Sequence, residues 1–254
     1  MHVQRSFPAQ RRLLVAGVAT APDQVLAAQR LRYQVFSEEY GADLGAATDR
    51  DTDRFDPHCE HIVVLNQLTG EVVATTRILL GPVADEIGGF YSETEFDLDT
   101  LKTGTGAFAE LGRTCVHADF RASSALSLLW TAVSQYLLRE GIDYLIGCAS
   151  ISMLDGGHKA WRVARKLQSD HLAPEPFRVT PKRQLPHLTA TSAMADSREI
   201  PPLLKAYMRL GAQVCGPPCW DPAFRCADLL VLLEVKSLAG RYARKFMRQP
   251  LSTG

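Results

Sequence analysis

The chain has 254 residues, of which 46% are hydrophobic and 22% are charged, a composition that suits a globular protein with a sizeable core. Lysine plus arginine and aspartate plus glutamate both number 28, so the zero net charge argues against nucleic-acid binding, which usually needs a basic domain. Six cysteines are too few in a chain of this length for a disulfide scaffold, and they predict reduced, buried thiols.

The N-terminal region predicts a strand and not an export signal. Arg11 and Arg12 precede a short apolar run that ends in Ala-Thr-Ala, which is the outline of a signal peptide. The run alternates like a strand, however, and Pro22 would directly follow the cleavage point, where it is unfavourable. We therefore expect a strand over residues 11–20 and a cytoplasmic protein. No stretch approaches the roughly 18 apolar residues that span a bilayer.

The next part of the chain predicts strands alternating with helices. A helix opens at Pro22 and Asp23, keeps apolar residues at helical spacing and ends at Gly41. An acidic loop follows over residues 42–57. The segments after this loop are predicted to be a hairpin with strands at 60–66 and 71–80, a strand at 108–120, a helix at 125–141 and a buried strand at 142–150.

Residues 151–199 are expected to form an insertion, with a helix around 158–168 followed by proline-broken sequence. The segments after it are predicted to be a helix from Pro201-Pro202 to Gly211, a short strand at 213–215, a strong strand at 227–235 and a basic, amphipathic tail at 241–248. The element order indicates an α/β (α+β) fold, with a mixed sheet flanked by helices. We expect one domain over residues 11–246, and flexible termini at 1–10 and 247–254.

Four stretches carry polar residues in a specific combination: LRYQVF at 31–36, DRDTDRFDPHCEH at 49–61, ATTRILL at 74–80 and ELGRTCV at 110–116. Together they resemble the acyl-homoserine-lactone synthases, a branch of the GNAT superfamily. The chain is still more similar to the bacterial ornithine lipid synthases, the ornithine N-alpha-acyltransferases. That similarity covers nearly the whole chain and includes GGFYSETEFDL, CWDPAF and the segments around the last helix and strand.

This resemblance implies a GNAT acyltransferase fold with a mixed, mostly antiparallel central sheet. It further implies transfer of a 3-hydroxyacyl chain from acyl carrier protein to the α-amine of ornithine, which gives lyso-ornithine lipid. The protein itself would bind no cofactor, because the donor carries 4'-phosphopantetheine on the carrier protein. Three alternatives stay open: another acceptor amino acid, an acyl-homoserine-lactone-type synthase, and a non-enzymatic, hemolysin-like protein that acts on membranes.

The resemblance also implies an active-site set. Glu110 is expected to collect the proton of the attacking amine, directly or through water, beside Arg113; a structural Glu110–Arg113 pair is the alternative. The carboxylates of Asp53 and Asp56 are natural receptors for the ammonium groups of a cationic amino acid. The alternative is that they cap their loop or pair with Arg54 and Arg32. The predicted substrate-binding residues are Arg32, Phe36, Asp53, Asp56 and Arg77.

The loop before the helix at 125–141 departs from most GNAT enzymes, in which a glycine-rich loop cradles coenzyme A pyrophosphate. Here the stretch is Arg121-Ala-Ser-Ser-Ala-Leu126, without glycine. A helix N-terminus still suits a single phosphate, which is what carrier-bound pantetheine presents. Arg121, Ser123 and Ser124 are therefore the phosphopantetheine candidates, with simple helix capping as the alternative for the serines.

Other constellations predict little chemistry. The residues between Asp56 and His61 include metal-ligand types, but successive strand residues face opposite sides, so we expect no metal. Cys215 and Cys219 have three residues between them, which is neither a redox nor a zinc-finger spacing. Cys115 as an acyl-enzyme nucleophile is unnecessary where direct attack suffices. The basic tail would suit acidic carrier protein or peripheral contact with the inner membrane, or would simply face water.

Overall fold

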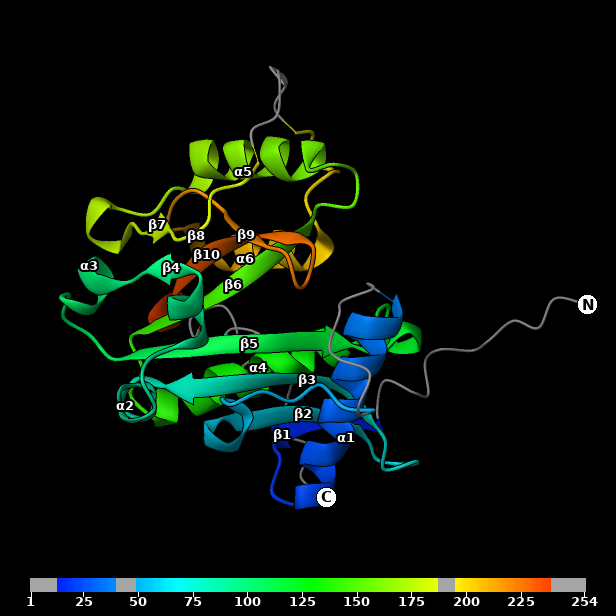
Figure 1. The fold of residues 1–254 in the computed structure, drawn as a ribbon. Coiled ribbons are helices and arrows are strands. Elements are labelled where there is room, and N and C mark those ends of the chain that lie inside the picture. The colour runs from blue at the N-terminus through cyan, green and yellow to red at the C-terminus, as the bar shows by residue number, and fades with distance from the viewer. Residues whose placement is uncertain (1–12, 40–48, 187–194, 239–254) are drawn as a thin grey trace, which may run out of the picture. The chain divides into compact units, whose positions relative to one another are not determined.

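The computed structural model describes residues 13–39, 49–186 and 195–238. The chain forms two compact units, each built from two stretches (Figure 1). The first unit contains residues 1–78 and 112–136, and the second contains residues 79–111 and 137–254. The boundary falls within two strands, β3 (Val72–Leu80) and β5 (Phe108–Val116). The predicted single domain at 11–246 stays a prediction.

The first unit is built on the predicted hairpin. Strand β1 (Leu14–Val18) pairs antiparallel with β2 (Glu60–Asn66), which pairs antiparallel with β3. Between β2 and β3 the chain turns at Gly70, which has a φ of 71° and donates its N–H to the Asn66 carbonyl at 2.8 Å. On the other side of β3 follows β5, where the Thr76 hydroxyl donates to the Gly112 carbonyl at 3.0 Å.

Helix α1 (Pro22–Tyr33) packs its apolar face on these strands and continues as a π-helix, η2 (Gln34–Glu39). Its Ala28 and Leu31, with Val35 of η2, form a buried cluster that includes Val63 of β2 and Val72 of β3. The expected stop at Gly41 lies outside the described residues. Helix α4 (Ala125–Arg139) confirms the helix predicted at 125–141, and two short 3₁₀ helices complete the unit: η3 (Asp56–His58) and η5 (Ala118–Phe120).

The second unit contains the remaining strands of the main sheet. The start of β5 pairs parallel with β6 (Tyr144–Ser152), over Phe108↔Tyr144 to Glu110↔Ile146. Strand β6 pairs antiparallel with β10 (Cys226–Glu234), which in turn pairs antiparallel with two short strands, β8 (Gln213–Val214) and β9 (Cys219–Asp221). The sheet is therefore mixed and mostly antiparallel, as predicted.

Helix α5 (His158–His171) confirms the helix predicted inside the 151–199 insertion, and its buried residues pack against β6 and β8. Helix α6 (Pro202–Leu210) begins and ends where the sequence predicts, since Gly211 closes it with a φ of 94°. The stretch between β3 and β5 forms short elements that the sequence analysis left unassigned. They are α2 (Gly81–Glu86), η4 (Tyr91–Thr94), β4 (Phe96–Asp97) and α3 (Asp99–Lys102). After α5 the chain forms η6 (Glu175–Phe177) and the short strand β7 (Thr180–Pro181), which pairs with β4.

Within the described ranges, no helix combines the length and the apolar character that crossing a membrane requires. The basic tail predicted at 241–248 and both predicted flexible termini lie outside the described residues.

Candidate active site

A network of three arginines and three aspartates lies in the first unit. Arg32, from α1, is fully buried and holds Asp56 through two hydrogen bonds, Nη1 to Oδ1 at 2.8 Å and Nη2 to Oδ2 at 2.7 Å. Its Nε donates to Asp51 Oδ2 at 2.8 Å. The planar guanidinium matches a carboxylate in this two-point geometry, which fixes direction as well as distance.

The other two arginines complete the network from β3 and β5. Arg77 donates two hydrogen bonds to Asp53, from Nη1 to Oδ1 at 2.6 Å and from Nη2 to Oδ2 at 2.7 Å. Its Nη1 also lies 3.3 Å from Asp56 Oδ1. Arg113 donates to both Asp51 at 3.1 Å and Asp53 at 3.2 Å. Three positive charges therefore face three negative ones, so the network is internally balanced.

The pKa values of these aspartates follow from that pairing. Burial by itself would raise the pKa of Asp56, but hydrogen bonds and charge from Arg32, helped by Arg77, lower it to about 2. The pKa of Asp53 is lowered in the same way, against burial, by Arg77 and Arg113. Burial lowers the pKa of the neighbouring His61, so this ring stays neutral near pH 7. Asp53 and Asp56 are therefore ionised at neutral pH.

The same aspartates also order the loop that carries them. Asp53 Oδ1 accepts from the backbone N–H of Phe55 at 2.9 Å and of Asp56 at 3.2 Å, and Asp56 Oδ2 accepts from the N–H of Asp53 at 3.0 Å. Arg54 stacks over the Phe55 ring at 4.4 Å. The predicted pairing of Asp56 with Arg32 is confirmed, and the oxygens of both aspartates are already used by the protein.

Phe36 belongs to the apolar side of this unit. It follows α1 in the π-helix, is half-buried and packs against the buried cluster formed by α1, β2 and β3. The structure thus brings five of the six polar residues predicted from the four motifs into one network: Arg32, Asp53, Asp56, Arg77 and Arg113. The sequence analysis did not single out Asp51, although it lies in the same acidic loop.

Glu110 lies in the second unit, on β5, with 5% of its surface exposed. Its carboxylate accepts two backbone N–H groups from the start of η4, Tyr91 at 2.6 Å through Oε2 and Ser92 at 2.8 Å through Oε1. These bonds fix the position of the carboxylate.

The phosphopantetheine candidates surround the start of α4. The Ser123 hydroxyl donates to the Phe120 carbonyl at 2.6 Å and accepts from the Ala125 N–H at 3.1 Å, so it caps the helix start. The Ser124 carbonyl accepts the N–H of Leu128 at 2.9 Å. Arg121 is exposed, and its Nε donates to the Val116 carbonyl at 3.3 Å. Capping, the predicted alternative for the serines, is confirmed for Ser123.

The six cysteines, all within the described residues, form no disulfide. Cys115 is buried in the apolar cluster of the first unit, where a reactive thiolate is unfavourable. Burial raises the pKa values of Cys215 and Cys219, which agrees with the packing role predicted for them. Glu60 is exposed and His61 buried, in agreement with the alternation that argued against a metal site there.

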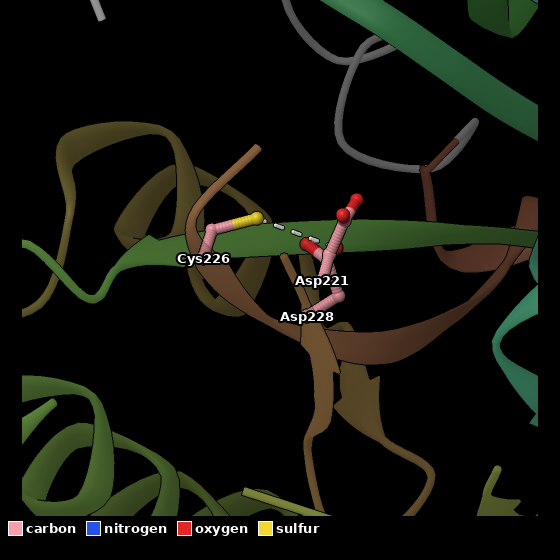
Figure 2. A group of neighbouring side chains, drawn as sticks. All are labelled: Asp221, Cys226 and Asp228. Atoms are coloured by element: carbon pink, nitrogen blue, oxygen red, sulfur yellow. Dashed lines mark hydrogen bonds between the residues drawn. The ribbon is translucent and has the colours of Figure 1, made fainter. Parts of the chain in front are cut away.

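Sequence reasoning missed a second group of acids. Asp221 and Asp228 lie with Cys226 on β9 and β10, and the ligand atoms of the three lie within 4.8 Å of one another (Figure 2). Glu95, which directly precedes β4, acts electrostatically on Asp228. Asp228 is an acid inside the otherwise apolar run ADLLVLL, and that contrast was the available signal.

The fold and the sequence together define an acyltransferase of the GNAT class. The family model described as Acetyltransferase (GNAT) domain matches residues 31–131. The chain is similar in structure to a CoA-dependent acyl-homoserine lactone synthase, BjaI, with a TM-score of 0.53 and 17% identity over 93% of this chain and 90% of that one. It is also similar to FeeM, an N-acyl amino acid synthase from uncultured soil microbes, with a TM-score of 0.51 and 16% identity over 89% and 95%.

Sequence similarity is more specific. The chain is 34% identical to the L-ornithine N(alpha)-acyltransferase of Rhodobacter capsulatus over 91% of this chain and 94% of that protein. It is 35% identical to the enzyme of the same name from Rhizobium meliloti, over 89% and 81%. The chain therefore belongs to the L-ornithine N(alpha)-acyltransferase family.

Proposed function

We propose that this chain transfers a 3-hydroxyacyl group from acyl carrier protein to the α-amine of L-ornithine, giving lyso-ornithine lipid. The observation that carries the acceptor is the end-to-end similarity to enzymes named L-ornithine N(alpha)-acyltransferase. The donor is inferred from the loop before α4, which lacks the glycines that would cradle a pyrophosphate but retains a helix start suited to one phosphate.

The reaction is an aminolysis. The neutral α-amine attacks the thioester carbonyl, the C–N bond forms, the C–S bond breaks and the pantetheine sulfur leaves as a thiolate, which finally receives the proton that the amine loses. In our proposal Glu110 takes the proton that the amine loses, directly or through water. Its two backbone hydrogen bonds support this role because they fix the carboxylate before substrate binds.

The arginine–aspartate network is proposed to act on the substrate through the loop at 49–58. Arg32, Arg77 and Arg113 use their donors on Asp51, Asp53 and Asp56, so their charges are already compensated. Arg113 and the substrate-binding set therefore serve as positioning residues, with Phe36 on the apolar side. Arg121, Ser123 and Ser124 are proposed to receive the phosphate of phosphopantetheine.

Mass spectrometry of the products of the purified protein tests the proposal. The protein is offered 3-hydroxyacyl carrier protein and, separately, acyl-coenzyme A, each with a mixture of the common amino acids and ornithine. Acylated ornithine from the carrier-protein donor is the expected main product. Acylation of another amino acid would reject ornithine as acceptor, and product from coenzyme A alone would reject the carrier protein. Because the product is an amphiphile, we also propose peripheral membrane contact, which co-sedimentation with anionic vesicles tests.

A further inference from the structure

A group of buried carboxylates lies in the second unit, apart from the arginine–aspartate network. Glu95, Asp221 and Asp228 are 2%, 5% and 3% exposed. Strands β9 and β10 place two of them together, because Asp221 pairs with Cys226 and Asp228 follows two residues later on the same strand (Figure 2). Three acids are thus enclosed in one small region, which we call the acidic cluster.

Within the part of the chain that the structure describes, no cation compensates the acidic cluster. Across the described ranges, no lysine, arginine or histidine forms an ion pair with Glu95, Asp221 or Asp228. This is the opposite of the network around Arg32, where three arginines balance three aspartates. Buried charges are normally paired, since an isolated ionised carboxylate is strongly disfavoured away from water.

The hydrogen bonds within the acidic cluster leave two of its carboxylate oxygens without a donor. Asp221 Oδ1 accepts from the N–H groups of Ala223 at 2.8 Å and Phe224 at 3.2 Å, so it is used by a turn. The Cys226 thiol donates to Asp228 Oδ2 at 3.5 Å. Two oxygens, Glu95 Oε2 and Asp228 Oδ1, are shielded from water and have no hydrogen-bond partner among the described residues. A buried acceptor in that condition calls for a donor.

The geometry points to a cation as that donor, because three buried carboxyl groups lie together and none of the described basic side chains pairs with them. Burial and the charge of Asp228 raise the pKa of Glu95, and burial together with Asp221 raises the pKa of Asp228. Both carboxyl groups therefore hold protons more tightly than usual. A positively charged ligand would take the place of these protons.

The acidic cluster is close to Glu110. Tyr91 connects them, because its backbone N–H holds Glu110 while its side chain hydrogen-bonds to Glu95. Cys148 is a second connection, since its side chain hydrogen-bonds to Glu95 and its thiol pKa is raised by burial and by both glutamates. The proposed proton acceptor for an α-amine thus has a group of buried carboxyl groups as its neighbour.

We propose that Glu95 and Asp228, supported by the charge of Asp221, form the subsite that receives the side-chain ammonium of ornithine. The proposal rests on the proposed function. An ammonium group offers three N–H donors and one positive charge to the two unpartnered oxygens. The acidic cluster then selects a cationic amino acid, because a neutral side chain would leave these oxygens buried and unpaired.

The test compares L-ornithine with L-norvaline, which has the same carbon chain without the side-chain amine. We would measure kcat/KM with both acceptors, and ornithine binding by calorimetry, for the wild type, Asp228→Asn and Glu95→Gln. Glu234→Gln is the matched control, because Glu234 lies exposed on the same strand, β10. We expect Asp228→Asn and Glu95→Gln to lower kcat/KM for ornithine by at least about 30-fold while changing norvaline less than about threefold.

Stability separates this role from a structural one. Replacing an unpaired buried carboxylate by its amide should leave the thermal midpoint unchanged or higher, whereas a structural carboxylate would show a lower midpoint. An unchanged ornithine-to-norvaline ratio in active variants would overturn the subsite and leave the proposed function standing. Ornithine binding that the variants lose, without any acylation by the wild type, would support the subsite and reject the function.

Two further outcomes would also be decisive. A wild type that neither binds nor acylates ornithine would remove both proposals. Metal analysis supplies the other result, because Asp221, Cys226 and Asp228 group three potential ligand atoms. A stoichiometric divalent ion in the purified protein, lost in Asp228→Asn, would overturn the assignment to an ammonium group.

Discussion

At the scale of single residues, the carboxylate of Glu110 has two roles. It holds the start of η4 through the N–H groups of Tyr91 and Ser92, and it is the proposed acceptor of the amine proton. Both roles depend on the same carboxylate position, which the two backbone hydrogen bonds fix. They also mean that activity and local stability have to be measured together in any Glu110 variant.

We expect Glu110→Gln to lower kcat by about 10²-fold, the usual scale for losing a general base. Steady-state kinetics with ornithine and 3-hydroxyacyl carrier protein would measure it, and the thermal midpoint would show whether the variant stays folded. Glu71→Gln, a change of an exposed glutamate in the β2–β3 turn, serves as control. A folded Glu110→Gln variant with wild-type turnover would remove Glu110 from the mechanism.

Part of the polar site was predictable from local motifs. Arg32, Asp53 and Arg77 lie at recognisable positions in a helix, a loop and a strand, and the structure brings them together. The acidic cluster was not predictable in this way. Glu95 and Asp228 are far apart in the chain, and only tertiary packing makes them buried neighbours. A local sequence pattern does not predict whether a buried acid will be paired with a basic side chain.

At the scale of elements, the long segments followed their sequence patterns and the short ones did not. Helices α4, α5 and α6 and the hairpin of β2 and β3 were predicted because apolar periodicity over many residues is a strong signal. Strands β4 and β7 have two residues each, too few to show any period. Their pairing depends on contacts between distant parts of the chain, which a local pattern does not record.

The start of α4 gives a prediction about the donor. Arg121→Ala is expected to raise KM for acyl carrier protein by about tenfold, the equivalent of one charged hydrogen bond, with little change in KM for ornithine. Arg139→Ala, at the opposite end of the same helix, is the matched control. Titration of each substrate at saturating levels of the other would measure both constants. An unchanged donor KM would refute a phosphate contact at Arg121.

Strand β6 gives a prediction about packing. A Cβ at Gly147 would collide with the carbonyl of Leu111 on β5, while a Cβ at Gly17 on β1 has open space. We expect Gly147→Ala to destabilise the protein by about 1–3 kcal/mol, as overpacking does, and Gly17→Ala to have little effect. Urea unfolding of the two variants would compare them. Equal midpoints would show that β5 and β6 can move apart at this point without loss of stability.

At the scale of the whole molecule, equal numbers of acidic and basic residues conceal an uneven distribution. The network of the first unit is balanced and largely buried, whereas the acidic cluster of the second unit has no paired cation among the described residues. Net charge, which was zero from the composition, therefore says nothing about where a charged ligand binds. The network instead affects how the chain responds to acid.

The pKa of Asp56 gives the sign of that response. Its folded-state value of about 2 is below the ordinary 3.8, so its stabilising contribution is complete above about pH 4 and is lost as pH falls toward 2. We expect Asp56→Asn to cost about 2 kcal/mol at pH 7, with its urea midpoint approaching that of the wild type near pH 2–3. Asp85→Asn, at an exposed position, is the control. A pH-independent difference would contradict this account.

The balance of three arginines and three aspartates also constrains how this sequence can change. Removing one charge leaves its former partner buried and uncompensated, so single substitutions at these six positions should be harmful. Paired neutral replacements should recover part of the loss. In a mutational scan, we expect strong positive epistasis between Arg32 and Asp56 and between Arg77 and Asp53, the two pairs with two-point contacts. We therefore expect these six positions to tolerate joint replacement better than single substitution.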